Sequence, residues 1–108
     1  MSVIETNKID AIGISKDNKS LVIMLSDHLD WNNEAAHLYA LQEKINAYLS
    51  FVETKQYKNL YPGKEFESYI IDIRFKFKTT DNCKKFIEVI NRQIRQYRIS
   101  IAVSVEGD

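Results

Sequence analysis

The sequence has few of the residues that mark specialised classes of protein. Cys83 is the only cysteine, so no internal disulfide can form and a reducing cytoplasm is the expected location. One proline and three glycines leave little scope for long irregular segments or a glycine-rich phosphate loop. The longest apolar run, residues 21–25, is far too short to cross a bilayer, and residues 1–10 do not resemble a signal peptide. We therefore expect a soluble, cytoplasmic protein without a membrane partner.

Length and charge further limit the class of protein to which the sequence can belong. The 108 residues suit one domain, residues 1–108, of which residues 1–7 are expected to form a flexible N-terminal segment. The net charge is zero, although residues 1–68 carry 7 basic against 10 acidic side chains and residues 69–108 carry 8 against 5. The whole chain therefore lacks the net basic footprint that nucleic-acid-binding proteins normally show.

The spacing of apolar residues predicts four strands and two helices. Apolar residues at every second position indicate a strand, and steps of three and four indicate a helix. The predicted strands are residues 8–15, 20–26, 69–78 and 99–105, and the predicted helices are residues 32–55 and, after a cap at Thr79 or Thr80, the segment up to Tyr97. The order is ββαβαβ, and the first two strands form a hairpin across the polar turn 16–19.

The third strand determines the predicted layers. Its alternation places five apolar side chains on one buried face: Tyr69, Ile71, Ile73, Phe75 and Phe77. The opposite face carries Ile70, Asp72, Arg74, Lys76 and Lys78. With one apolar face, both helices should cover the same side, which right-handed crossovers allow if the chain advances steadily across the sheet. We predict an α+β two-layer sandwich with a four-stranded mixed sheet, order 1-2-3-4, first strand antiparallel, and two helices on one face.

Each predicted helix has one apolar stripe for the core. In the first helix the stripe is Leu38, Leu41, Ile45, Leu49 and Val52. In the second it is Cys83, Phe86, Ile87, Ile90, Ile94 and Tyr97. A cysteine in a core stripe is usually a small, inert apolar side chain, so Cys83 is not expected to act as a nucleophile.

Polar and aromatic side chains concentrate where the second strand meets the first helix. The segment 26–31 reads Ser-Asp-His-Leu-Asp-Trp and contains one of two histidines and the only tryptophan. Joints of this kind often carry functional residues. The candidate functional patch is Asp27, His28, Asp30, Trp31, Glu34 and His37.

This patch has several interpretations. Asp27, His28, Asp30, Glu34 and His37 are metal-ligand types, but only one Glu-x-x-His spacing is present, and di-iron bundles need two with further carboxylates. His28 with Asp27 or Asp30 could serve in acid–base chemistry, although no nucleophile is recognisable beside them. Alternatively, Asp30 or a neighbouring asparagine caps the helix, Asp27 stabilises the turn, His37 lies half-exposed beside the core stripe and Trp31 plugs the end of the core. We assign no catalytic residue, metal ligand or cofactor.

The segment 26–31, together with residues 41–49 (Leu-Gln-Glu-Lys-Ile-Asn-Ala-Tyr-Leu), resembles a family of small bacterial proteins catalogued as a domain of unknown function. The resemblance is specific from Ser26 to Glu53 and looser through Tyr61-Pro62 and the last two strands. It implies a bacterial, stand-alone domain and lends no reaction, cofactor or catalytic residue.

The sequence favours a binding module without catalysis. The open sheet face, with Ile70, Asp72, Arg74, Lys76 and Lys78, or the unpaired last strand could meet an unknown protein partner or a second copy of the chain. A small hydrolase or metal-dependent enzyme that uses Asp27, His28, Asp30 and His37 is one alternative. A weak nucleic-acid binder is the other, but it is disfavoured because the strand's aromatic side chains should be buried, away from its basic ones.

Overall fold

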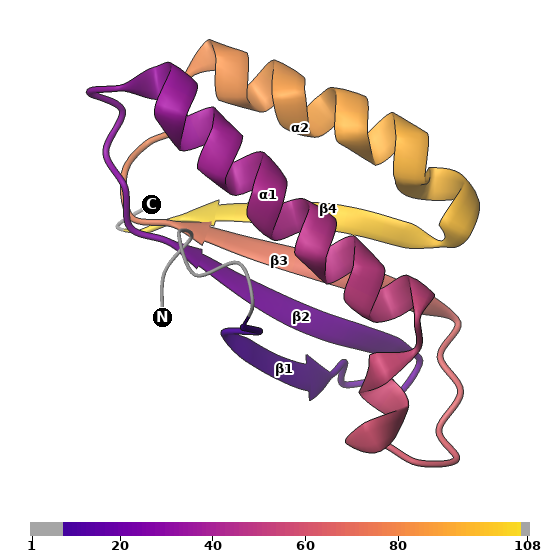
Figure 1. Cartoon of the computed structure of the whole chain (residues 1–108). Helices are drawn as coiled ribbons and strands as arrows, with labels where there is room; N and C mark the ends of the chain where they lie inside the picture. The colour runs from indigo at the N-terminus through magenta and orange to yellow at the C-terminus, as the bar shows by residue number, and fades with distance from the viewer. Residues whose placement is uncertain (1–7, 107–108) are drawn as a thin grey trace.

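The computed structural model describes residues 8–106 as a four-stranded sheet with two helices (Figure 1). The expected flexible segment 1–7 lies outside the described residues. The strands are β1 (Ala11–Ile14), β2 (Ser20–Asp27), β3 (Ser68–Phe75) and β4 (Ile99–Val105). The helices are α1 (Glu34–Glu53) and α2 (Asp81–Ile94), with the short 3₁₀ helices η1 (Gln56–Asn59) and η2 (Arg95–Tyr97).

The sheet topology confirms the predicted layering. The strand order is β1-β2-β3-β4, with β1 antiparallel to β2 and the other pairs parallel. Both helices lie on the same side of the sheet, and both begin at the end where the parallel strands finish (Figure 1). Two consecutive β-α-β crossovers of the same hand give this arrangement when the chain advances one strand at a time.

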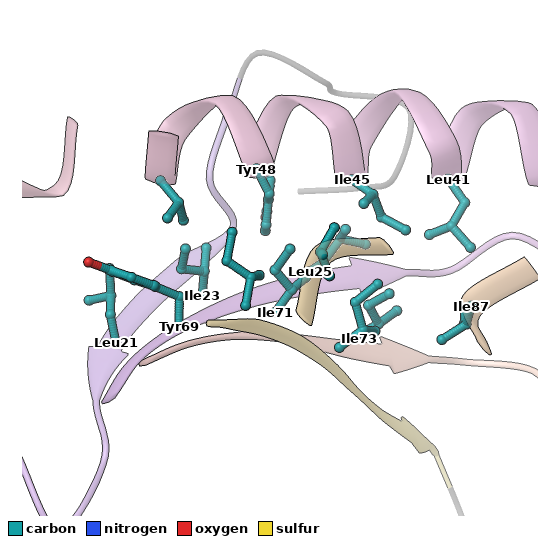
Figure 2. Packing of buried hydrophobic residues seen from close by; sticks show 14 of the residues in the cluster. Leu21, Ile23, Leu25, Leu41, Ile45, Tyr48, Tyr69, Ile71, Ile73 and Ile87 are labelled. Atoms are coloured by element: carbon teal, nitrogen blue, oxygen red, sulfur yellow. The ribbon is translucent and has the colours of Figure 1, made fainter. Parts of the chain in front are cut away.

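The core lies between α1, α2 and one face of the sheet. On β2 and β3, every second residue is fully or almost fully buried, as strict alternation requires. Figure 2 shows these side chains beneath α1, which contributes Leu41, Ile45 and Tyr48. The partly apolar stripe of α1 is therefore held against the two central strands by the burial of apolar surface.

Three sequence expectations need correction at the ends of elements. Strand β3 stops at Phe75, where β2 and β4 also end, so Phe77 is 41% exposed instead of buried. Helix α2 ends at Ile94, and the 3₁₀ helix η2 follows from Arg95. Because a 3₁₀ helix has three residues per turn, Tyr97 no longer lies on the apolar stripe and is 55% exposed. Strand β1 begins at Ala11, three residues later than predicted.

The start of α1 is capped by an asparagine, one of the two predicted alternatives. The side-chain oxygen of Asn33 accepts a hydrogen bond from the backbone N–H of Ala36 at 3.2 Å. Asp30 is not the cap: its carboxylate accepts hydrogen bonds from the backbone and the side chain of Asn32, both at 3.1 Å. Thr80 caps α2 in the same way by accepting from the N–H of Cys83 at 3.1 Å.

We predict that Asn33→Ala lowers the free energy of unfolding by about 1 kcal/mol, because an orphan N–H at the helix start loses its acceptor. Asp30→Ala should cost less, since within residues 8–106 the hydrogen bonds of the Asp30 carboxylate go to the exposed Asn32. Urea denaturation followed by the fluorescence of the single tryptophan measures both variants. An equal or larger loss for Asp30→Ala would show that the turn before the helix matters more than its cap.

Candidate functional site

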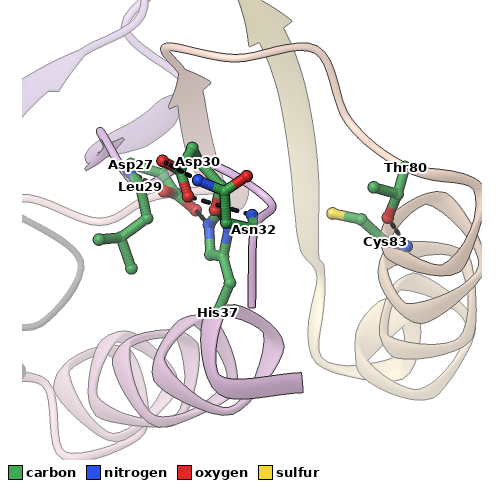
Figure 3. Close-up of polar contacts among 7 residues, drawn as sticks. All are labelled: Asp27, Leu29, Asp30, Asn32, His37, Thr80 and Cys83. Carbon is green, nitrogen blue, oxygen red and sulfur yellow. Dashed lines mark hydrogen bonds and ion pairs between the residues drawn. The ribbon is translucent and has the colours of Figure 1, made fainter. Parts of the chain in front are cut away.

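A buried histidine–aspartate pair lies at the centre of the candidate patch (Figure 3). Asp27 is the last residue of β2, and its side chain points to the core face, where it is 1% exposed. His37 comes from the first turns of α1 and is 3% exposed, whereas the sequence suggested a half-exposed side chain. Its Nε2 lies 2.6 Å from Oδ2 of Asp27, and its Nδ1 lies 2.9 Å from the carbonyl oxygen of Asp30.

These contacts define the protonation of the pair. The Asp30 carbonyl can only accept, so His37 Nδ1 must carry a proton and donate it. The second contact then holds one proton between Nε2 and the Asp27 carboxylate, either as an ion pair or as a neutral pair. Asp27 also accepts a hydrogen bond from the N–H of Leu29 at 3.1 Å. Both ring nitrogens of His37 therefore form hydrogen bonds, and these bonds link α1 to the end of β2 and to the segment that follows it.

Burial raises the pKa of the Asp27 carboxyl above its ordinary value, while the hydrogen bond and charge of His37 oppose the rise. Between pH 3.8, the ordinary value, and the raised pKa of the folded state, the folded Asp27 carboxyl keeps a proton that the unfolded carboxyl has released. The resulting stabilisation is complete below pH 3.8 and disappears as the pH rises through the folded pKa.

We predict a pH dependence of stability that Asp27→Asn removes. The unfolding free energy of the wild type minus that of the variant should fall as the pH rises from 4 toward neutrality, because only the wild type releases this proton. Urea titrations of both proteins at several pH values measure the difference. Taking the difference cancels groups that do not contact position 27, including the exposed Asp17 and the half-buried Glu34, whose pKa values are lowered. A difference that rises with pH would contradict the prediction.

Trp31 covers the histidine. Its ring stacks on the imidazole of His37 with centroids 3.7 Å apart and planes 23° apart, and its centroid lies 6.2 Å from that of Phe75. The indole is half-buried, and its Nε1 is buried without a hydrogen-bond partner among residues 8–106. Trp31 therefore closes the end of the core above the pair.

Among the other members of the patch, Asp30 contacts this pair through its backbone carbonyl, and its carboxylate binds Asn32 instead. His28 and Asp30 are exposed. Glu34 points to the start of α2, where its carboxylate accepts a hydrogen bond from Asn82 Nδ2 at 2.9 Å. Hydrogen bonds from Thr80 and Asn82 lower the pKa of Glu34. Within residues 8–106, no three histidine, cysteine, aspartate or glutamate side chains are grouped so that they could hold a metal ion.

A second buried network was not predicted from the sequence. Lys44 of α1 is 0% exposed, and its Nζ lies 3.0 Å from Oδ1 of Asp10. The other Asp10 oxygen accepts from the N–H of Ser26 at 2.8 Å. Tyr48 accepts from the N–H of Asp10 at 3.0 Å and donates to the carbonyl of Met24 at 2.7 Å. The network ties α1 to the segment before β1 and to β2.

The signal for this network was present in the sequence. Position 44 lies three residues after Leu41 and four before Tyr48, on the stripe that faces the core. A lysine at such a position requires a buried partner of opposite charge, because an isolated buried charge is too costly. The partner could not be identified, since Asp10 is distant in sequence and belongs to no regular element.

A pocket of about 440 Å³ opens on the uncovered side of the sheet, where the parallel strands end. We name it the strand-end pocket. The polar residues that line it are Ser26, Asp27, His28, Arg74, Lys76, Ser104 and Glu106, of which Asp27 is only 1% exposed. Backbone hydrogen bonds fix the rim of this pocket one residue beyond the ends of the strands. The N–H of Lys76 donates to the carbonyl of Asp27, and the N–H of Glu106 donates to the carbonyl of Phe75, both at 2.8 Å. Thus His28 and the predicted sheet-face residues Arg74 and Lys76 line one cavity.

Cys83 is enclosed in the core at the start of α2. It is 0% exposed, and burial, aided by the negative charges of Asp27 and Glu34, raises the pKa of its thiol to about 12. Figure 3 shows it at the start of α2, where its N–H bonds to Thr80. The reactive form of cysteine is the thiolate, which is scarce at neutral pH when the pKa is this high.

We predict that Cys83 in the folded protein reacts with a disulfide reagent at pH 8 at least about 100-fold more slowly than in urea, because it is both buried and protonated. Absorbance of the released thiol follows the reaction. Rapid labelling in native buffer would mean that the start of α2 opens readily. The Cys83→Ser variant provides the blank.

The fold and these sites define a small two-layer α+β domain whose open sheet face carries both apolar and polar side chains. The chain belongs to DUF6572, a family of unknown function whose model matches residues 1–107, so the resemblance to a domain of unknown function is confirmed. Its bacterial origin stays a prediction. No curated protein and no solved structure matches the sequence. Neither helix within residues 8–106 combines the length and apolar character needed to span a bilayer.

Proposed function

We propose that this protein is a non-catalytic binding module that meets another protein through the open face of its sheet. One observation carries the proposal: both helices lie on the opposite face (Figure 1), and the side chains at the centre of the open face are apolar. Val22, Met24 and Ile70 are only half-buried there, and Val22 is in register with Ile70. An apolar centre surrounded by polar groups is the usual anatomy of a protein interface.

The rim of this face is polar and accessible. Arg74 lies between Ser26 and Ser104 in the strand register, and all three residues are exposed. Asp72, half-buried, lies two residues before Arg74 on the same face. Such a rim suits a partner that forms hydrogen bonds and charge pairs around an apolar contact.

The edge of β4 is a less suitable surface than the face. The carboxamide of Asn91 in α2 accepts from the N–H of Ile101 at 2.7 Å and donates to its carbonyl at 3.2 Å. These two bonds occupy the backbone groups that an added strand would use at the middle of β4. Capping an edge in this way hinders edge-to-edge pairing, which favours the face as the surface for a partner or a second copy.

The geometry of the candidate patch also supports binding over catalysis. The hydrolase alternative requires His37 or His28 beside an orienting carboxylate and a nucleophile. Both nitrogens of His37 are engaged, and Cys83 is buried and protonated. His28 is exposed on the pocket wall, where it can contribute to a contact.

Single-stranded nucleic acid is a second candidate partner because Phe77 is exposed. The Nζ of Lys76 lies 5.6 Å from the centroid of the Phe77 ring, and Lys78 follows on the same exposed segment. An exposed aromatic ring beside basic side chains is one element of a stacking platform. One ring without a net basic surface makes this the weaker candidate.

A photo-crosslinking experiment tests the proposal. A benzophenone amino acid is placed at Ile70 on the open face and, as a matched control, at Glu88 on the exposed side of α2. We expect irradiation in the native host to give a discrete protein adduct for position 70 and none for position 88. The mass of the adduct distinguishes a second copy from a different protein. Equal labelling at both positions would contradict the proposal.

A further inference from the structure

The strand-end pocket continues the open face to its polar end. Ile70 and Arg74 lie on the same face of β3, four residues apart, so the apolar centre leads directly to the pocket. A four-residue step along a strand covers about 13 Å. An extended segment of a partner could therefore contact both places at once.

The guanidinium of Arg74 is available in this pocket. Its side chain is 59% exposed, and its Nε and Nη2 contact one oxygen of Asp72 at 3.4 Å, which is long for a hydrogen bond. Nη1 makes no hydrogen bond within residues 8–106, so one edge of the planar group can still bind. Guanidinium groups bind carboxylates by two parallel hydrogen bonds in that plane.

Hydroxyl and amine donors surround Arg74. Ser26 and Ser104 are its register neighbours on β2 and β4, so the three side chains form a row about 10 Å wide across the sheet. Lys76 adds a second positive charge to the lining, whereas Glu106 supplies one negative charge. The exposed charges of the lining therefore have a small positive excess, because the fourth charged residue, Asp27, is buried against His37. This excess and the many donors suit a carboxylate better than a doubly charged phosphate.

We propose that the strand-end pocket binds the carboxylates of an acidic peptide segment of the partner. This inference rests on the proposed function, because the apolar centre beside the pocket gives a peptide a second contact that a free anion lacks. Arg74 is the main anchor, with Lys76, Ser26 and Ser104 completing the recognition.

The test uses a hexaglutamate peptide with two leucines at one end as the probe. Its binding to the isotope-labelled full chain is followed by NMR in 50 mM salt. We expect shifts at the backbone amides of residues 26–28, 74–76 and 104–106 and weaker binding in 300 mM salt, because exposed charges are screened. Arg74→Gln with Lys76→Gln should weaken binding at least about fivefold, the scale of one to two exposed charge pairs.

A control double variant removes the same two positive charges from a surface away from the pocket. Lys84→Gln with Arg92→Gln removes one lysine and one arginine from the exposed side of α2 and should leave binding unchanged. Three results would overturn the proposal: no shifts at the pocket, an equal loss in both double variants, or saturation of the pocket by inorganic phosphate or a ten-residue oligothymidine more tightly than by the peptide. If position 70 still crosslinks to a protein, the binding module stands and only the acidic chemistry is wrong.

Discussion

Replacing Asp27 with alanine should lower the free energy of unfolding by about 3–5 kcal/mol, the usual cost of removing one partner from a buried charged or hydrogen-bonded pair. The change leaves His37 Nε2 without its 2.6 Å partner in a place that is 3% exposed. It also removes the acceptor of the Leu29 N–H. Chemical denaturation followed by the fluorescence of Trp31 gives the value.

Asp27→Asn is the matched control for this prediction. The asparagine oxygen can still accept from Leu29, and its amide can donate to the unprotonated Nε2 of a neutral His37. The hydrogen bonds are therefore kept while the charge is removed, and we expect a loss of about 1 kcal/mol or less. If the alanine variant were as stable as the asparagine variant, the pair would not be a tie between β2 and α1.

Replacing Lys44 with methionine should lower the free energy of unfolding by about 3–5 kcal/mol, because it leaves the carboxylate of Asp10 buried without its counter-ion. The Asp10 side chain is 3% exposed and would keep the N–H of Ser26 as a donor. Methionine fills nearly the same volume as lysine, so the loss of packing is small. Urea denaturation at pH 7 measures the change.

A second substitution separates charge from packing at this network. Adding Asp10→Asn to Lys44→Met removes the uncompensated charge and should restore most of the lost stability, since neutral replacements of buried ion pairs are often tolerated. The exposed pair Lys58 and Glu65, with its atoms 3.7 Å apart, provides a comparison. Lys58→Met should change stability by less than about 1 kcal/mol, as for other surface pairs. If the double variant were no more stable than Lys44→Met, the loss of stability would come from packing and not from the uncompensated charge.

Strict alternation on β3 made the layering predictable. Once one face of residues 69–75 was wholly apolar and the other carried Asp72 and Arg74, both helices had to lie together, and the strand order followed from the hand of the crossovers. The ends of elements were less predictable, because Phe77 and Tyr97 continue the apolar pattern past the points where strand pairing and helical geometry stop.

The candidate site was only partly predictable. The sequence drew attention to Asp27, Trp31 and His37 as residue types in one short segment and the helix after it. It did not reveal that Asp27 and His37 bind each other beneath Trp31, while the exposed side chain of His28 lines the strand-end pocket. Residues adjacent in sequence diverge at the end of a strand because successive side chains point to opposite faces of the sheet.

By itself, the sequence determined the elements, their layers and a sheet face with an apolar centre, because these depend on periodic patterns within short segments. Only the tertiary structure decided which distant polar groups meet, Asp27 with His37 and Asp10 with Lys44, and that Arg74 stands in register with Ser26 and Ser104. These contacts join segments that are distant in sequence. The distance and direction that a hydrogen bond requires are set only when the whole chain is packed.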